Sequence, residues 1–181
     1  MNLESIRSNT VRTILRFSVP SIIAMVLNSF VTIVDGFYIG NYVGKEGIAA
    51  VNLGLPILYL YLAIGIMVGV GGIAIAGIAL GAQDIKKCNA VFNQTVISTL
   101  TVSVIISLLA AAFFKPIMAV FNMDTQVAGC FYSYYSIMIM AYPVMLVNTT
   151  FGMFMRGEGS PGLFMRIMIV TVISNIVLDY L

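Results

Sequence analysis

The chain contains no histidine. Without an imidazole it cannot build a histidine-based catalytic triad or a histidine metal site, and it lacks the usual general base near neutral pH. Any proton chemistry must therefore use carboxylates. No nucleophile paired with another base is evident, so we expect neither an enzyme nor a bound cofactor.

Charge is scarce and nearly balanced. Charged residues make up 9% of the 181 residues and the formal net charge is +2, whereas soluble domains carry about 25% charged residues. A net charge this small gives no reason to propose a nucleic-acid partner. The charges matter through their positions in the chain.

Cysteine is limited to Cys88 and Cys130, which have no CxxC spacing. The topology described below puts them at opposite membrane faces, about 30 Å apart. A disulfide cannot bridge that distance, so on this topology none joins them.

Apolar residues, in contrast, make up 60% of the sequence, against about 45 to 50% in soluble domains. They form charge-free runs over residues 17–34, 47–83, 88–114, 125–155 and 167–178. A membrane-spanning helix needs about 20 apolar residues, which the first four runs supply. We therefore predict an all-α, polytopic transmembrane helix bundle, a lobe over residues 17–181 with helices at about 14–40, 48–81, 88–114, 126–155 and 166–181.

The two ends of the chain differ from this bundle. Residues 1–16 are polar, no small-residue cleavage site follows them and more spans come after, so we expect a retained cytoplasmic segment rather than a signal peptide. The last run, counted from Ile167 to Leu181, reaches only about 22 Å. We therefore expect a truncated fifth helix and a chain that is a fragment of a longer protein.

Basic residues predict the orientation in the membrane. Seven of the nine Lys and Arg fall on one side if the N-terminus is cytoplasmic: Arg7, Arg12, Arg16, Lys86, Lys87, Arg156 and Arg166. Only Lys45 and Lys115 fall on the other side. The positive-inside rule therefore favours a cytoplasmic N-terminus.

Asp35 is an acid deep within otherwise uncharged sequence. An ionisable side chain at the centre of a membrane helix costs roughly 3 kcal/mol or more, so it is rarely kept without a partner or a task. Asp35 lies 19 residues after Arg16, and Asp179 lies 13 after Arg166, each on a helix that runs outward. Both acids then lie about 20 to 28 Å from the inner charges, where one cavity can hold them.

Asn175 lies four residues before Asp179 and therefore on the same helix face. Its amide offers both donors and an acceptor. Two carboxylates and an amide in a low-dielectric pocket suit a proton or a small cation, because like charges held close together favour keeping a proton on one of them. Asp35, Asn175 and Asp179 are therefore candidate ligands for a proton or for sodium. A sodium ion would be held by Asp35 and Asp179.

Simpler roles stay open for these polar residues. Asp35 can lie hydrated and idle at the outer interface, and Asp179 can pair structurally with a residue outside the sequence. Asn148 and Thr149 lie about 12 Å from Arg156 on the fourth helix, near the middle of the bilayer. Hydrogen bonding between helices is the simplest explanation for them.

Glycines gather in the second helix. Residues 69–74 match a loose GxGxxA nucleotide fingerprint, but they lie mid-membrane with no preceding strand. Helix packing is the better interpretation, as it is for the GxxxG spacing at 65–69 and 77–81.

Three prolines fall within the apolar runs. Pro20 and Pro56 are expected near helix starts, where a proline costs little. Pro143 is expected to kink the fourth helix.

Six short motifs lie along these predicted helices. They are Val-Pro-Ser at 19–21, Val-Asp-Gly-Phe-Tyr-Ile-Gly at 34–40, Gly-Ile-Ala-Ala-Val-Asn-Leu-Gly-Leu-Pro at 47–56, Gly-Ala-Gln-Asp at 81–84, Arg-Gly-Glu-Gly at 156–159 and Asn-Ile-Val-Leu-Asp at 175–179. In order and spacing they resemble the N-terminal half of a multidrug and toxic compound extrusion (MATE) transporter. The likeness covers nearly the whole chain and is closest to the bacterial DinF-like branch.

The resemblance implies a bacterial inner-membrane antiporter of twelve helices in two lobes, which exports small organic cations or drugs in exchange for protons or sodium. It implies a coupling-ion site formed by Asp35, Asn175 and Asp179. An amide on the fourth helix also belongs to that network. Its position corresponds here to Asn148 or to Thr149. The bilayer and the missing C-terminal lobe are then the partners of this chain, which alone should transport nothing.

Two alternatives differ from an efflux transporter. A lipid-linked sugar flippase shares the architecture, but it is expected to carry cationic residues in its cavity, and the predicted spans hold no Lys or Arg. A truncated, non-transporting membrane subunit would use its helices only to pack with a partner. If the reading frame continues into seven further hydrophobic segments, the transporter is favoured over the non-transporting subunit.

Overall fold

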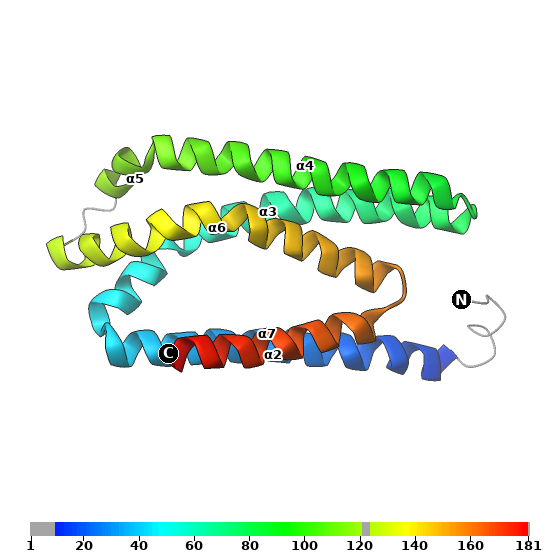
Figure 1. Cartoon of the computed structure of the whole chain (residues 1–181), viewed down its shortest axis with the longest axis horizontal. Helices are drawn as coiled ribbons and strands as arrows, with labels where there is room; N and C mark the ends of the chain where they lie inside the picture. The colour runs from blue at the N-terminus through cyan, green and yellow to red at the C-terminus, as the bar shows by residue number, and fades with distance from the viewer. Residues whose placement is uncertain (1–9, 121–123, 181) are drawn as a thin grey trace. The chain divides into compact units, whose positions relative to one another are not determined.

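The structure is a computed structural model that describes residues 10–120 and 124–180. Its helices are α2 (Thr10–Tyr42), α3 (Lys45–Gly81), α4 (Ile85–Ala112), the short α5 (Phe114–Val120), α6 (Thr125–Gly157) and α7 (Pro161–Tyr180) (Figure 1). Five of them are long and apolar enough to cross a membrane. The predicted all-α, polytopic bundle is therefore confirmed, and the chain is a multi-pass membrane protein.

Part of the predicted N-terminal segment, residues 1–9, lies outside the described residues. The rest of that segment is helical and opens α2. After α4 the chain forms the short helix α5. Pro116 lies in the first turn of α5, where its missing N–H costs little because no intrahelical acceptor is available there.

The chain divides into two compact units. The first unit contains α2 as far as Tyr38 and the chain from Met155 onward, which is mainly α7. Within it, α2 and α7 run side by side and in the same direction (Figure 1), and a side-chain hydrogen bond joins them. The second unit runs from Ile39 to Phe154 and packs α3, α4 and α6 together.

Aromatic rings form the core of the second unit. The rings of Tyr61 and Tyr142 lie 4.5 Å apart between centroids, and Phe131 stacks on Tyr135 at the same separation. All four side chains are almost fully buried. Buried tyrosines need partners for their hydroxyls, and Tyr61 donates to Ser107 Oγ at 3.1 Å. The apolar content of this unit therefore builds a packed core rather than only a lipid-facing surface.

Small hydroxyl side chains bring α4 close to its neighbours. Every fourth residue of one α4 face is buried and carries a hydroxyl: Thr95, Thr99, Ser103 and Ser107. Thr150 of α6 donates to Thr99 Oγ1 at 3.3 Å. Helix pairs in lipid associate through such small residues and interhelical hydrogen bonds, so this face fixes α4 against the rest of the unit.

Several α3 glycines lie at close helix contacts. A Cβ added to Gly65 would overlap Leu146 of α6, one added to Gly69 would lie 2.8 Å from Met153 Sδ, and one added to Gly72 would overlap Thr95 of α4. These contacts support the packing role predicted for the GxGxxA stretch. The second GxxxG pair differs, because within the described chain nothing lies within 4 Å of a Cβ added at positions 77 or 81.

The prolines do not lie where the sequence predicted. Pro20 and Pro56 are interior residues of α2 and α3, so the prediction that they lie near helix starts was wrong. The cause is that polar residues such as Lys45 continue each helix beyond the apolar run that was used to place its start. Pro143 is interior to α6 as expected, and α6 bends along its length (Figure 1), as a missing backbone N–H allows.

Candidate functional site

Three of the four predicted site residues meet in the first unit. Asn175 Nδ2 donates to Asp35 Oδ1 at 3.1 Å, between residues 140 positions apart in sequence. The Asp179 carboxylate lies one turn beyond Asn175 on the same face of α7, and therefore close to Asp35. All three side chains are half-buried. The parallel packing of α2 and α7 thus places two acids and an amide together at one level of the unit.

Two oxygen atoms of this group have unmet hydrogen-bonding capacity. Asn175 Oδ1 and Asp179 Oδ2 are buried and accept no hydrogen bond within the part of the chain that the structure describes. A buried polar atom without a partner costs roughly 1 to 3 kcal/mol, more if charged. Native proteins rarely retain that cost, so these oxygens suit a ligand that donates a proton or carries positive charge.

The balance of donors and acceptors points the same way. The Asn175 amide is the donor in its hydrogen bond to Asp35, while the carboxylates of Asp35 and Asp179 offer acceptors only unless one holds a proton. Hard cations such as sodium prefer carboxylate and amide oxygens. No group of three or more His, Cys, Asp or Glu able to hold a metal occurs among the described residues.

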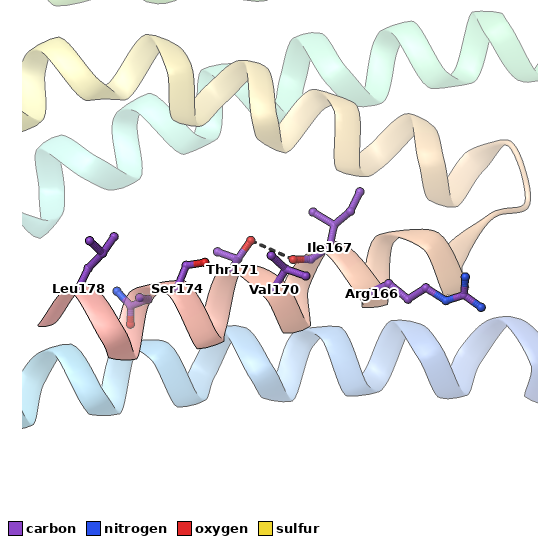
Figure 2. A pocket seen from close by; sticks show the side chains of 7 residues that line it. Arg166, Ile167, Val170, Thr171, Ser174 and Leu178 are labelled. Carbon is purple, nitrogen blue, oxygen red and sulfur yellow. Dashed lines mark hydrogen bonds between the residues drawn. The ribbon is translucent and has the colours of Figure 1, made fainter. Parts of the chain in front are cut away.

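A cavity of about 550 Å³ lies along α7 next to this group. Figure 2 shows Ile167, Thr171 and Leu178 on its wall, pointing away from α2. Asn175 also lines the cavity, so the amide that holds Asp35 belongs to the cavity wall as well. The Thr171 hydroxyl is already used, because it donates to the Ile167 carbonyl oxygen at 3.0 Å.

Arg166 is a lining residue that the sequence interpretation missed. The candidate span begins at Pro161, so Arg166 lies inside α7 and the expectation that no Lys or Arg lies within a span was wrong. The sequence predicted that the fifth helix begins at about residue 166, whereas Pro161 already opens it. The three- and four-residue spacing of Ile167, Val170, Ser174 and Leu178 was the signal that could have revealed the cavity wall.

The fourth predicted residue lies in the other unit. Asn148 is on α6 with an exposed side chain, and its neighbour Thr149 donates its hydroxyl to the Met145 carbonyl oxygen of the same helix at 2.9 Å. Membership of Asn148 in the site stays a prediction.

Comparison with known proteins identifies the family. The MatE family model matches residues 20–181. This chain belongs to the MatE family. The predicted resemblance is therefore confirmed, and the matched residues include Asp35, Asn175 and Asp179.

Curated relatives of the MatE chain carry export and resistance names. "Multidrug export protein MepA" of Staphylococcus saprophyticus is 27% identical over 173 residues, which cover 96% of this chain and 38% of the relative. "Probable multidrug resistance protein YoeA" of Bacillus subtilis is 26% identical over 167 residues, 92% of this chain and 36% of the relative. The MatE chain thus spans less than two fifths of the length of these relatives.

Solved structures share the fold of the MatE chain. One is described as the outward-facing conformation of a multidrug resistance MATE family transporter, with a TM-score of 0.85 and 24% identity, covering 92% of this chain and 37% of that one. A MOP superfamily transporter from Pyrococcus furiosus gives a TM-score of 0.84 at 24% identity, with the same coverage. At this identity the likeness establishes the helical fold.

Proposed function

We propose that this chain forms the N-terminal lobe of a cation-coupled multidrug efflux antiporter. The complete protein exports small organic cations and other drugs across the bacterial cytoplasmic membrane in exchange for protons or sodium. The observation that carries the proposal is the group of Asp35, Asn175 and Asp179, with two buried oxygens that accept no hydrogen bond from the described residues. The export names of the longer relatives support it, and a C-terminal lobe completes the transport path.

Neutralisation of the acids provides the coupling step. With no ion bound, the two negative charges of Asp35 and Asp179 repel each other and keep α2 and α7 hydrated around them. A proton or sodium ion removes that repulsion, and the helices then favour a second packing arrangement. The ion can shift this equilibrium only by the difference between its affinities for the two arrangements. Drug release follows if the second arrangement opens the pathway to the other side.

The N-terminus is cytoplasmic in this proposal. Arg166 and the other inner charges then lie at the cytoplasmic surface, and the acids lie in the outer half of the bilayer. An ion entering from outside therefore reaches Asp35 and Asp179 without crossing the whole membrane.

The proposal predicts reduced accumulation of a fluorescent organic cation in cells that make the full-length parent protein. Dissipating the proton gradient should restore accumulation if protons drive export, and removing external sodium should restore it if sodium does. Equal accumulation in cells with and without the protein, at confirmed membrane expression, would contradict cation efflux and favour the flippase or packing-subunit alternatives.

A paired substitution on α6 tests the remaining amide. Because the Thr149 hydroxyl is committed to its own helix, we expect the Asn148 amide to serve the ion site. Asn148→Ala should weaken the apparent affinity for the driving ion by about tenfold, the effect of losing one hydrogen bond to a charged group. Thr149→Ala should leave it unchanged. An unchanged affinity in Asn148→Ala, or an equal loss in Thr149→Ala, would contradict this assignment.

A further inference from the structure

The α7 cavity combines one cationic end with an apolar length. Arg166 lies at its predicted inner end, is exposed, and makes no ion pair within the described ranges. Val170 and Leu178 farther along are 64% and 70% exposed and line the same cavity. An exposed guanidinium followed by an apolar wall matches an amphiphile with an anionic head and a hydrocarbon tail.

The length of this wall matches one leaflet of a bilayer. From Arg166 to Leu178 the helix rises about 18 Å, and half of a hydrocarbon core is about 15 Å thick. A lipid chain whose head pairs with Arg166 therefore ends at the level of Leu178. Such a chain passes Asn175, which lies about 14 Å from Arg166 along the axis.

We propose that an anionic phospholipid of the inner leaflet binds along α7, with its phosphate on Arg166 and one acyl chain against Ile167, Val170 and Leu178. The guanidinium fork matches phosphate oxygens in charge and geometry. Because Asn175 belongs to both the cavity wall and the contact with Asp35, the bound lipid links membrane composition to the state of the acidic pair. The inner-leaflet placement rests on the proposed orientation.

These 181 residues contain no tryptophan, which permits a clean test in the full-length parent once any tryptophan outside them is replaced by phenylalanine. In that background, Leu178→Trp introduces a fluorescent reporter in the cavity wall, and Ile173→Trp introduces one on an exposed α7 position outside that wall. Each variant is reconstituted in phosphatidylcholine vesicles that contain a small fraction of chain-brominated phosphatidylglycerol or chain-brominated phosphatidylcholine. Bromine quenches tryptophan only on close approach, and both leaflets contain the lipid, so the result does not depend on the orientation of the protein.

We expect brominated phosphatidylglycerol to quench the Leu178→Trp reporter with about fivefold higher apparent affinity than brominated phosphatidylcholine, the preference that one basic residue near an anionic surface provides. Adding Arg166→Gln should remove the preference. Adding Lys86→Gln, an exposed basic residue on the same predicted membrane side, should leave it intact. The Ile173→Trp reporter should show no preference.

Four outcomes would overturn the proposal. Equal quenching by both lipids would show that the head is not recognised, and a preference that survives Arg166→Gln would show that Arg166 is not the contact. An equal preference in the Ile173→Trp reporter would show general enrichment of the anionic lipid around α7 without a chain bound in the cavity. Relief of quenching by tetraphenylphosphonium would assign the wall to organic cations. Because the assay measures no transport, its failure is distinct from failure of the efflux proposal.

Discussion

Asp35→Asn in the full-length parent is expected to raise accumulation of a fluorescent organic cation to the level of cells that lack the transporter. The asparagine keeps the size of the side chain and can still accept the bond from Asn175 Nδ2, which measures 3.1 Å in the structure. It cannot take up a proton or provide a negative charge for sodium. Asp179→Asn should have the same effect, because the remaining acid alone leaves no charge repulsion for the ion to remove.

Stability separates this effect from misfolding. A charged group within the bilayer costs roughly 3 kcal/mol at a helix centre, so its replacement by a neutral amide should not lower the melting temperature or the membrane level of the protein. Asp84→Asn is the matched control, because Asp84 caps α4 by accepting from Lys87 N at 2.9 Å and asparagine caps helices equally well. Efflux by Asp35→Asn at the wild-type rate would refute the coupling role.

Gly54→Ala is expected to destabilise the second unit strongly. A Cβ at this position would overlap the ring of Tyr135. That ring cannot move aside cheaply, because its side chain is 1% exposed and its hydroxyl donates to the Val51 carbonyl oxygen at 3.0 Å. Overpacking of a close-packed core typically costs about 1 to 3 kcal/mol, and losing the tyrosine bond adds to this cost.

The measurement is thermal unfolding of the purified protein in detergent, followed by the loss of monodisperse protein after heating. Gly71→Ala is the control in the same helix, since within the described chain nothing lies within 4 Å of a Cβ added there. Alanine is the better helix former by up to about 1 kcal/mol, so this variant should melt at or slightly above the wild-type temperature. Equal melting of both variants would mean that Tyr135 repacks without cost.

Axial positions in this fold were predictable from the sequence, because each helical residue adds a fixed rise. Counting from Arg16 and Arg166 placed Asp35 and Asp179 at similar depth, and the four-residue spacing placed Asn175 on the same face as Asp179. The structure joins Asn175 to Asp35 directly. The spans themselves were predictable because long apolar stretches have few alternatives in lipid.

Lateral neighbours were harder to predict, because a single sequence does not say which helix faces which. Nothing in the pattern around Gly54 indicated that Tyr135, 81 positions later, would pack against it. The two GxxxG pairs of α3 have the same spacing, yet among the described residues only the first pair meets α6. Helix starts were also misplaced, as Pro20, Pro56 and Arg166 show, because polar residues can continue a helix beyond its apolar run.

The bond between Asn175 and Asp35 has a consequence for synthesis. Asp35 enters the membrane when 140 residues still separate it from its amide partner. At a synthesis rate of about 5 to 20 residues per second, the carboxyl group waits about 7 to 28 s for Asn175 to be made. During that interval α2 must keep the acid at a hydrated level of the bilayer or beside the insertion machinery. Asp35 must therefore be tolerated without its partner during insertion and must also bind the coupling ion in the folded protein.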